Sequence, residues 1–165
     1  MERILVIGFG NPYRGDDGLG LHAAEQFEGI NHDPAVTVLA QQELHPELAE
    51  VLSHADFVIF LDATAQGVPG TVSVCKLTAK CEVNGLFSHE LTPETLLAAA
   101  KVLYGRCPEG MLVSVAGENF GISSHLSPEV SAALPRVLAR IEELIDSLQG
   151  RELVLTRAAR AGNSA

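Results

Sequence analysis

The segment that most constrains the fold of this chain is residues 8–20, GFGNPYRGDDGLG, which follows the apolar run RILVIG. The apolar run is rich in β-branched residues and predicts a short buried strand over residues 3–8. Residues 19–27 then carry apolar side chains at the spacing of one helix face. The segment therefore predicts a strand, a glycine loop and a helix, which together form the opening unit of a layered α/β sheet.

The glycine loop has the position of a nucleotide-binding loop but not its chemistry. The G-x-G-x-x-G fingerprint requires a third glycine where this chain has Tyr13, and the adjacent carboxylates Asp16 and Asp17 would repel phosphate. No G-K-[ST] sequence follows the glycines, so a P-loop is excluded as well. A loop with two adjacent carboxylates is instead suited to a cationic ligand. Because a helix has one N-cap, we assign Asp16 to that role and Asp17 to a functional one, with a solvated helix end as the alternative for Asp17.

Composition and charge limit the classes of partner. A chain of 165 residues suits one domain, which we expect over residues 1–150, with residues 151–165 as a flexible tail. The net charge of −10 argues against nucleic-acid and anionic-membrane partners. No apolar stretch approaches the length of a membrane-spanning helix, which is about 20 residues, and no secretory leader is evident, so we expect a cytoplasmic protein. The three cysteines are widely spaced and support neither a disulfide framework nor a C-x-x-C site.

Strands and helices alternate along most of the remaining sequence, which indicates a largely parallel sheet. The orientation of the strand near residues 71–77 stays open, and an antiparallel edge strand is one solution because no helix precedes it. Pro135 should kink or split the last helix. The expected strands are residues 36–39, 56–61, 71–77 and 111–116, and the expected helices are residues 46–54, 93–103 and 128–148.

Candidate functional residues follow from the rule that parallel sheets bind ligands at the carboxyl ends of their strands. Asp17 lies after the first strand and Asp62 ends the strand of residues 56–61, so both carboxylates open onto one crevice if these strands are neighbours. The alternative for Asp62 is a turn residue that bonds its own backbone. His89 precedes the helix of residues 93–103 on a loop that could return to the same crevice, although it could equally be a structural loop residue. We expect the other histidines on helix surfaces or in loops, and His45 is the one that is hardest to exclude from the site.

Two carboxylates and one imidazole suit a borderline divalent metal such as zinc or nickel, with positions left open for water or substrate. The zincin motif H-E-x-x-H is excluded, because Pro93 stands where its second histidine would be.

The pattern G-x-G-N-x-x-x-x-D-D-G-x-G, read from Gly8 to Gly20, resembles the N-terminal motif of the hydrogenase maturation proteases. These proteins are endopeptidases of the nickel-iron hydrogenases, and the resemblance extends over about residues 2–148. It implies a phosphorylase/hydrolase-like fold, a three-layer α/β/α sandwich with a five-stranded mixed sheet. The implied strand order is 2-1-3-5-4, with the fourth strand antiparallel.

The resemblance also implies an activity. Members of the family remove a short C-terminal extension from the hydrogenase large-subunit precursor after nickel insertion, behind a basic residue near the cysteines that hold the metal. Asp17, Asp62 and His89 are the implied metal-contacting and catalytic residues. We expect the nickel to be supplied by the substrate rather than bound permanently.

Two departures from the family pattern stand out. Some relatives carry Glu where this chain has Asp17, and several place an acid and glycines where this chain has Ala40 and glutamines. Two other functions stay open, namely a self-contained metallohydrolase with its own ion and a non-catalytic α/β module that binds a small molecule or a partner.

Overall fold

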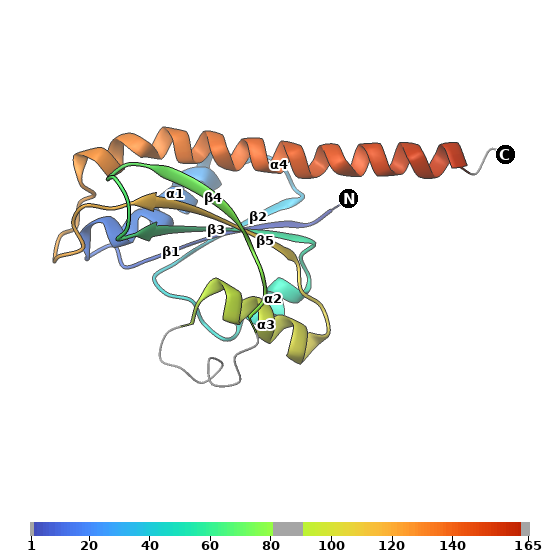
Figure 1. Cartoon of the computed structure of the whole chain (residues 1–165), viewed down its shortest axis with the longest axis horizontal. Helices are drawn as coiled ribbons and strands as arrows, with labels where there is room; N and C mark the ends of the chain where they lie inside the picture. The colour runs from blue at the N-terminus through green and yellow to red at the C-terminus, as the bar shows by residue number, and fades with distance from the viewer. Residues whose placement is uncertain (1, 81–90, 163–165) are drawn as a thin grey trace.

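The computed structural model describes residues 2–80 and 91–162, and it is built on one five-stranded sheet. Its strand order is β2-β1-β3-β5-β4. The pairs β2–β1, β1–β3 and β3–β5 are parallel, whereas β4 runs antiparallel to β5 (Figure 1). The implied order is confirmed, and the open orientation of the fourth strand is settled as an antiparallel edge. The strands are β1 (Ile4–Phe9), β2 (Val36–Gln41), β3 (Phe57–Thr64), β4 (Val72–Leu77) and β5 (Glu109–Ala116).

Helices cover both faces of the sheet and complete the predicted three layers. Helices α1 and α4 pack on one face and helices α2 and α3 on the other (Figure 1). The helices are the 3₁₀ turn η1 (Gly15–Gly18), α1 (Leu19–Ile30), α2 (Leu48–Ser53), α3 (Pro93–Tyr104) and α4 (Pro128–Gly162). Within residues 2–80 and 91–162, none of them is long and apolar enough to cross a membrane.

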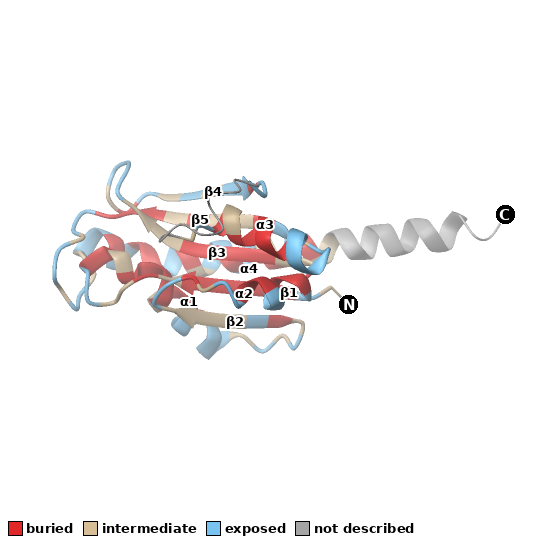
Figure 2. Cartoon of the chain, turned by 90° about the horizontal axis from the view of Figure 1, so that it is seen from below, coloured by how far each residue is buried: buried red, intermediate tan, exposed pale blue. Residues whose placement is uncertain are grey.

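The central strand β3 supplies side chains to two separate cores, because successive residues of a strand point to opposite faces. Ile59 and Leu61 pack with α1 and α4, while Val58 and Phe60 pack with α2 and α3. All four are buried, as are most residues of the inner strands (Figure 2). The next residue in this alternation on the α2/α3 side is Asp62, which places a carboxylate beyond the apolar run.

Helix α4 differs from its prediction in two ways. It continues through Pro135 as one element, so Pro135 does not split it, and it runs to Gly162 rather than ending near Leu148. Pro135 lies on the exposed side, and the carbonyl that loses its helical partner belongs to Ser131, which is also exposed and can bond to water. The flexibility of residues 151–165 stays a prediction.

Two glycines let α1 lie directly on the sheet. A Cβ atom at Gly20 would overlap the carbonyl oxygens of Phe9 and Leu61, and one at Gly8 would overlap the carbonyl oxygen of Gly20. The backbone of α1 therefore touches the backbones of β1 and β3 with no side chain between them. This contact holds the start of the helix against the carboxyl ends of the two strands.

We expect Gly20→Ala to lower the free energy of unfolding by about 3 kcal/mol, because the added methyl group meets rigid backbone rather than a side chain that could move. Denaturant titration measures the change. The matched control is Gly29→Ala on the same helix, where no atom lies within 4 Å of the new Cβ. That variant should gain up to about 1 kcal/mol from helix propensity. Equal stability of the two variants would contradict the close contact.

Candidate active site at the carboxyl edge of the sheet

Asp16 is a buried clamp between two loops and not the helix cap that the sequence predicts. Its side chain is fully buried, and neither η1 nor α1 has a side-chain cap hydrogen bond. The carboxylate accepts hydrogen bonds from the backbone N–H groups of Glu118 (2.8 Å), Asn119 (2.9 Å) and Ser127 (2.6 Å). The Ser127 hydroxyl donates a fourth, at 2.9 Å.

Backbone contacts reinforce this clamp. The N–H of Asp16 donates to the Asn119 carbonyl at 2.8 Å, and the N–H of Gly15 donates to the Ser123 carbonyl at 2.9 Å. Arg14 and Ser123 also form a parallel bridge. The glycine loop after β1 is thus fixed to the segment between β5 and α4.

The charge state of Asp16 follows from this environment. Burial raises the pKa of its carboxyl, but the hydrogen bonds from Asn119, Ser127 and Glu118 outweigh burial and hold the pKa below the ordinary value. Asp16 therefore stays ionised in the folded protein at neutral pH, and its negative charge is part of the fold.

Asp17 points toward two neighbouring cavities. Its Oδ2 atom accepts a hydrogen bond from the N–H of Asn11 at 2.9 Å, which fixes the carboxylate at the carboxyl end of β1. The first cavity, about 890 Å³ in volume, is lined by Asp17 together with Arg14, Glu43 and His45, and we call it the outer cavity. The second has a volume of about 390 Å³ and is lined by Glu43 and by both predicted carboxylates, Asp17 and Asp62, after which we call it the two-carboxylate cavity.

Asp62 sits within β3, which continues two residues beyond it to Thr64. It pairs with Ser114 of β5, whereas the pairing of β1 with β3 ends one residue earlier, at Leu61. The Asp62 side chain lines the two-carboxylate cavity, and its Oδ1 atom accepts a hydrogen bond from the N–H of Ala63 at 2.8 Å. The predicted convergence of Asp17 and Asp62 on one crevice is therefore confirmed, and the local backbone bond that the sequence left open exists as well.

Burial raises the pKa of the Asp62 carboxyl to about 7, and the charge of Asp17 adds to the rise. The hydrogen bond from Ala63 opposes it. Near neutral pH Asp62 is thus present in both its protonated and its ionised form. The site contains one carboxyl group that can exchange a proton with a bound ligand near physiological pH.

His89, the third predicted site residue, lies outside the described residues. Among residues 2–80 and 91–162, no group of three or more His, Cys, Asp or Glu side chains is arranged to hold a metal ion. Glu43 is a site residue that our sequence analysis missed, since it lines both cavities. It follows the end of β2, so the strand-end rule that selected Asp17 would also have found it.

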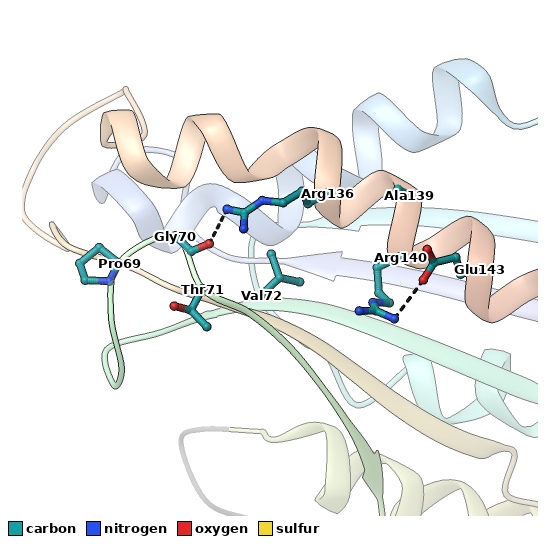
Figure 3. A pocket seen from close by; sticks show the side chains of 8 residues that line it. All are labelled: Pro69, Gly70, Thr71, Val72, Arg136, Ala139, Arg140 and Glu143. Carbon is teal, nitrogen blue, oxygen red and sulfur yellow. Dashed lines mark hydrogen bonds and ion pairs between the residues drawn. The ribbon is translucent and has the colours of Figure 1, made fainter.

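A further cavity, of about 480 Å³, lies between the start of β4 and α4 and contains neither site carboxylate (Figure 3). Its charged side chains already have partners. Arg136 donates to the Gly70 carbonyl at 2.8 Å, and Arg140 pairs with Glu143 at 2.9 Å (Figure 3). The contact of Arg136 fastens the turn between β3 and β4 to α4, so we assign this region a structural role.

Comparison with known proteins identifies the family. No family model matches the chain. The hydrogenase 2 maturation protease of Escherichia coli strain K12 is 30 % identical to it over 153 residues, which cover 86 % of this chain and 92 % of that protein. The chain belongs to the hydrogenase maturation protease family. It is accordingly a peptidase.

A solved structure and a second curated protein are also similar to the chain. The hydrogenase-maturating endopeptidase HybD from E. coli superposes with a TM-score of 0.71 at 27 % identity, over 88 % of this chain and 93 % of that one. The hydrogenase expression/formation protein HupD of Bradyrhizobium diazoefficiens is 31 % identical over 117 residues, or 68 % of this chain. That match spans 60 % of HupD, which is less than two thirds of its length.

We expect Asp16→Asn to destabilise the fold by about 3 kcal/mol. The neutral amide has only one acceptor oxygen for the four hydrogen bonds, and its NH2 group would face backbone N–H donors. The folded pKa of Asp16 is lowered, so its contribution is present above the unfolded pKa, about 3.9, and is lost as pH falls through the folded pKa. Denaturant unfolding between acid and neutral pH should show a shallower pH dependence in Asp16→Asn. Asp146→Asn, an exposed site on α4, is the control. Equal pH slopes in the wild type and Asp16→Asn would contradict the clamp.

Carboxyl carbon NMR should give Asp62 a titration midpoint near 7. In Asp17→Asn the midpoint should fall, because the negative charge that disfavours ionisation of Asp62 is gone. It should stay above the ordinary value, because burial is the larger cause of the rise. Asp146→Asn should leave the midpoint unchanged. A wild-type midpoint close to the ordinary value, about 4, would show that Asp62 is not desolvated.

Proposed function

We propose that this protein is the endopeptidase that removes the C-terminal extension of a nickel-iron hydrogenase large-subunit precursor after nickel has been inserted. Membership of the hydrogenase maturation protease family supports the substrate class. The observation that carries the proposal is the pair Asp17 and Asp62, which come from distant parts of the chain and line one cavity. The reaction would take place in the cytoplasm, on a precursor that already carries its metal.

The nickel of the substrate serves as the recognition handle. The two-carboxylate cavity is lined by Asp17, Glu43 and Asp62 and by no lysine or arginine among the described residues, so its potential favours a cationic centre. Carboxylate oxygens and an imidazole are donors that a borderline divalent ion accepts, and His89 is the proposed third donor. A precursor without metal lacks the group to which this site is complementary.

The two carboxylates have different tasks in this proposal. Asp17 is oriented by the N–H of Asn11 and presents its charge to both cavities. Asp62 can lose its proton near neutral pH when a cation approaches, because its raised pKa comes from burial and from the charge of Asp17. Binding of the metal-loaded segment would therefore ionise Asp62, and the apolar neighbours Phe9, Leu44 and Leu91 would limit access of water.

Asp17→Asn, Asp62→Asn and His89→Ala should each slow cleavage of nickel-loaded precursor by at least about 100-fold, because each removes one donor from the site. Purified protein is incubated with precursor, and intact mass reports the loss of the extension. Asp146→Asn should cleave like the wild type. If all three site variants cleaved as fast as the wild type, the assignment of the site would be wrong.

The same assay with nickel-free precursor tests the recognition handle. We expect that precursor to stay uncut. Equal cleavage of both precursors would refute recognition through nickel while leaving the protease activity in place. Elemental analysis of purified, chelator-free protein tests the alternative of a self-contained metallohydrolase. A metal bound in stoichiometric amount would favour that alternative.

A further inference from the structure

Two large apolar side chains are exposed together beside the candidate site. Tyr13 is 66 % exposed and Ile122 is 100 % exposed. The N–H of Ser123 donates to the carbonyl of Tyr13 at 3.1 Å, and Arg14 pairs with Ser123 in parallel register. Tyr13 and Ile122 therefore occupy neighbouring backbone positions on the two joined loops, each with its side chain in solvent, and we call this pair the loop patch.

The loops that carry the loop patch are held by hydrogen bonds on both sides. The N–H of Tyr13 donates to Asn11 Oδ1 at 2.9 Å, and the N–H of Gly121 donates to Asn119 Oδ1 at 2.9 Å. The buried carboxylate of Asp16 binds the second loop at Asn119. Apolar side chains on such fixed loops lose little further backbone freedom when a partner covers them, which is a property of good interface anchors.

The loop patch is continuous with the mouth of the site. Asn11, Arg14 and Asp17 line the outer cavity, and Tyr13 lies between Asn11 and Arg14 in the same loop. We call this edge of the outer cavity the rim, and a protein whose chain end reaches Asp17 across the rim would cover the loop patch. Arg14 is exposed beside the loop patch and carries a positive charge, whereas the net charge of the chain is negative. The rim therefore suits a partner surface that is apolar and has an acidic side chain next to its apolar area.

We propose that the loop patch is the docking surface for the folded body of the hydrogenase large-subunit precursor, separate from the residues that act on its C-terminal segment. The inference rests on the proposed function. Docking through Tyr13 and Ile122 contributes to binding of the precursor and leaves the chemistry at Asp17 and Asp62 unchanged.

The chain offers a matched control at the other end of the sheet. Leu103 is 66 % exposed, as is Tyr13, and Val102 beside it is 59 % exposed. Both lie at the end of α3, which leads to the start of β5 and so to the edge opposite the carboxyl ends of the parallel strands. Both pairs consist of two neighbouring exposed apolar side chains, and they lie at opposite edges of the sheet.

The test compares the double variant Tyr13→Ser/Ile122→Ser with the double variant Val102→Ser/Leu103→Ser and the wild type. Cleavage of nickel-loaded precursor is followed by intact mass over a range of precursor concentrations. We expect the loop-patch variant to raise KM by about tenfold or more and to change kcat by less than about twofold. The Val102/Leu103 variant should match the wild type in both. Thermal unfolding of each variant shows that the fold is kept, and the single variants Tyr13→Ser and Ile122→Ser provide the same test if a double variant unfolds.

The outcomes separate the two proposals. If the wild type cleaves the precursor and the loop-patch variant has the same KM, docking at the loop patch is wrong while the proposed function stands. An equal rise of KM in the Val102/Leu103 variant would also overturn it, because the effect would not depend on position. If the wild type cleaves no precursor, the proposed function fails, and the docking surface fails with it.

Discussion

The buried carboxylate of Asp16 is the interaction on which the rest of the site depends. A buried charge is costly unless hydrogen bonds replace its water, and Asp16 receives four of them, all from the segment between β5 and α4. Because three of the donors are backbone N–H groups, the carboxylate determines the path of that segment and not only its side chains. The glycine loop after β1 and the start of α4 are thereby joined although more than 100 residues separate them.

The neighbouring residues Asp16 and Asp17 show how local environment separates structural from functional carboxylates. Asp16 is saturated with donors, has a lowered pKa and has no exposed surface from which to reach a ligand. Asp17 has one backbone donor and faces two cavities. Across the crevice, Asp62 has a raised pKa because burial removes water without supplying enough donors. Asp17 and Asp62 each accept one backbone hydrogen bond and line the same cavity, so their carboxylates keep acceptor capacity for a ligand that Asp16 does not have.

Local patterns in the sequence were enough to predict the strands and a layered α/β sheet, and to predict that Asp17 and Asp62 converge if their strands are neighbours. The three layers and the strand order, which makes β1 and β3 neighbours, came from the family resemblance. The cap of α3 also follows its sequence, since Thr92 accepts from the N–H of Thr95 and Gly105 ends the helix in the left-handed conformation. The antiparallel direction of β4 came from the family resemblance, because the sequence near residues 71–77 shows only that no helix precedes it.

The predictions for Asp16 and Pro135 failed for different physical reasons. The role of Asp16 could not be found from its neighbours, because its partners Glu118 and Ser127 lie 102 and 111 residues away. An aspartate before a helix has the same local signature whether it caps that helix or crosses to another loop. Pro135 does not split α4 because a proline on the exposed side of a packed helix removes one bond that water can replace.

The clamp also connects binding with chemistry. Asp16 is next to Asp17, and the loop that it binds at Asn119 continues to Ile122. A loss of the clamp would therefore release the carboxylate that faces the cavities and one of the two apolar side chains beside it. The four hydrogen bonds of this buried charge therefore act together with the backbone bonds between the two loops to position the proposed docking surface relative to the site.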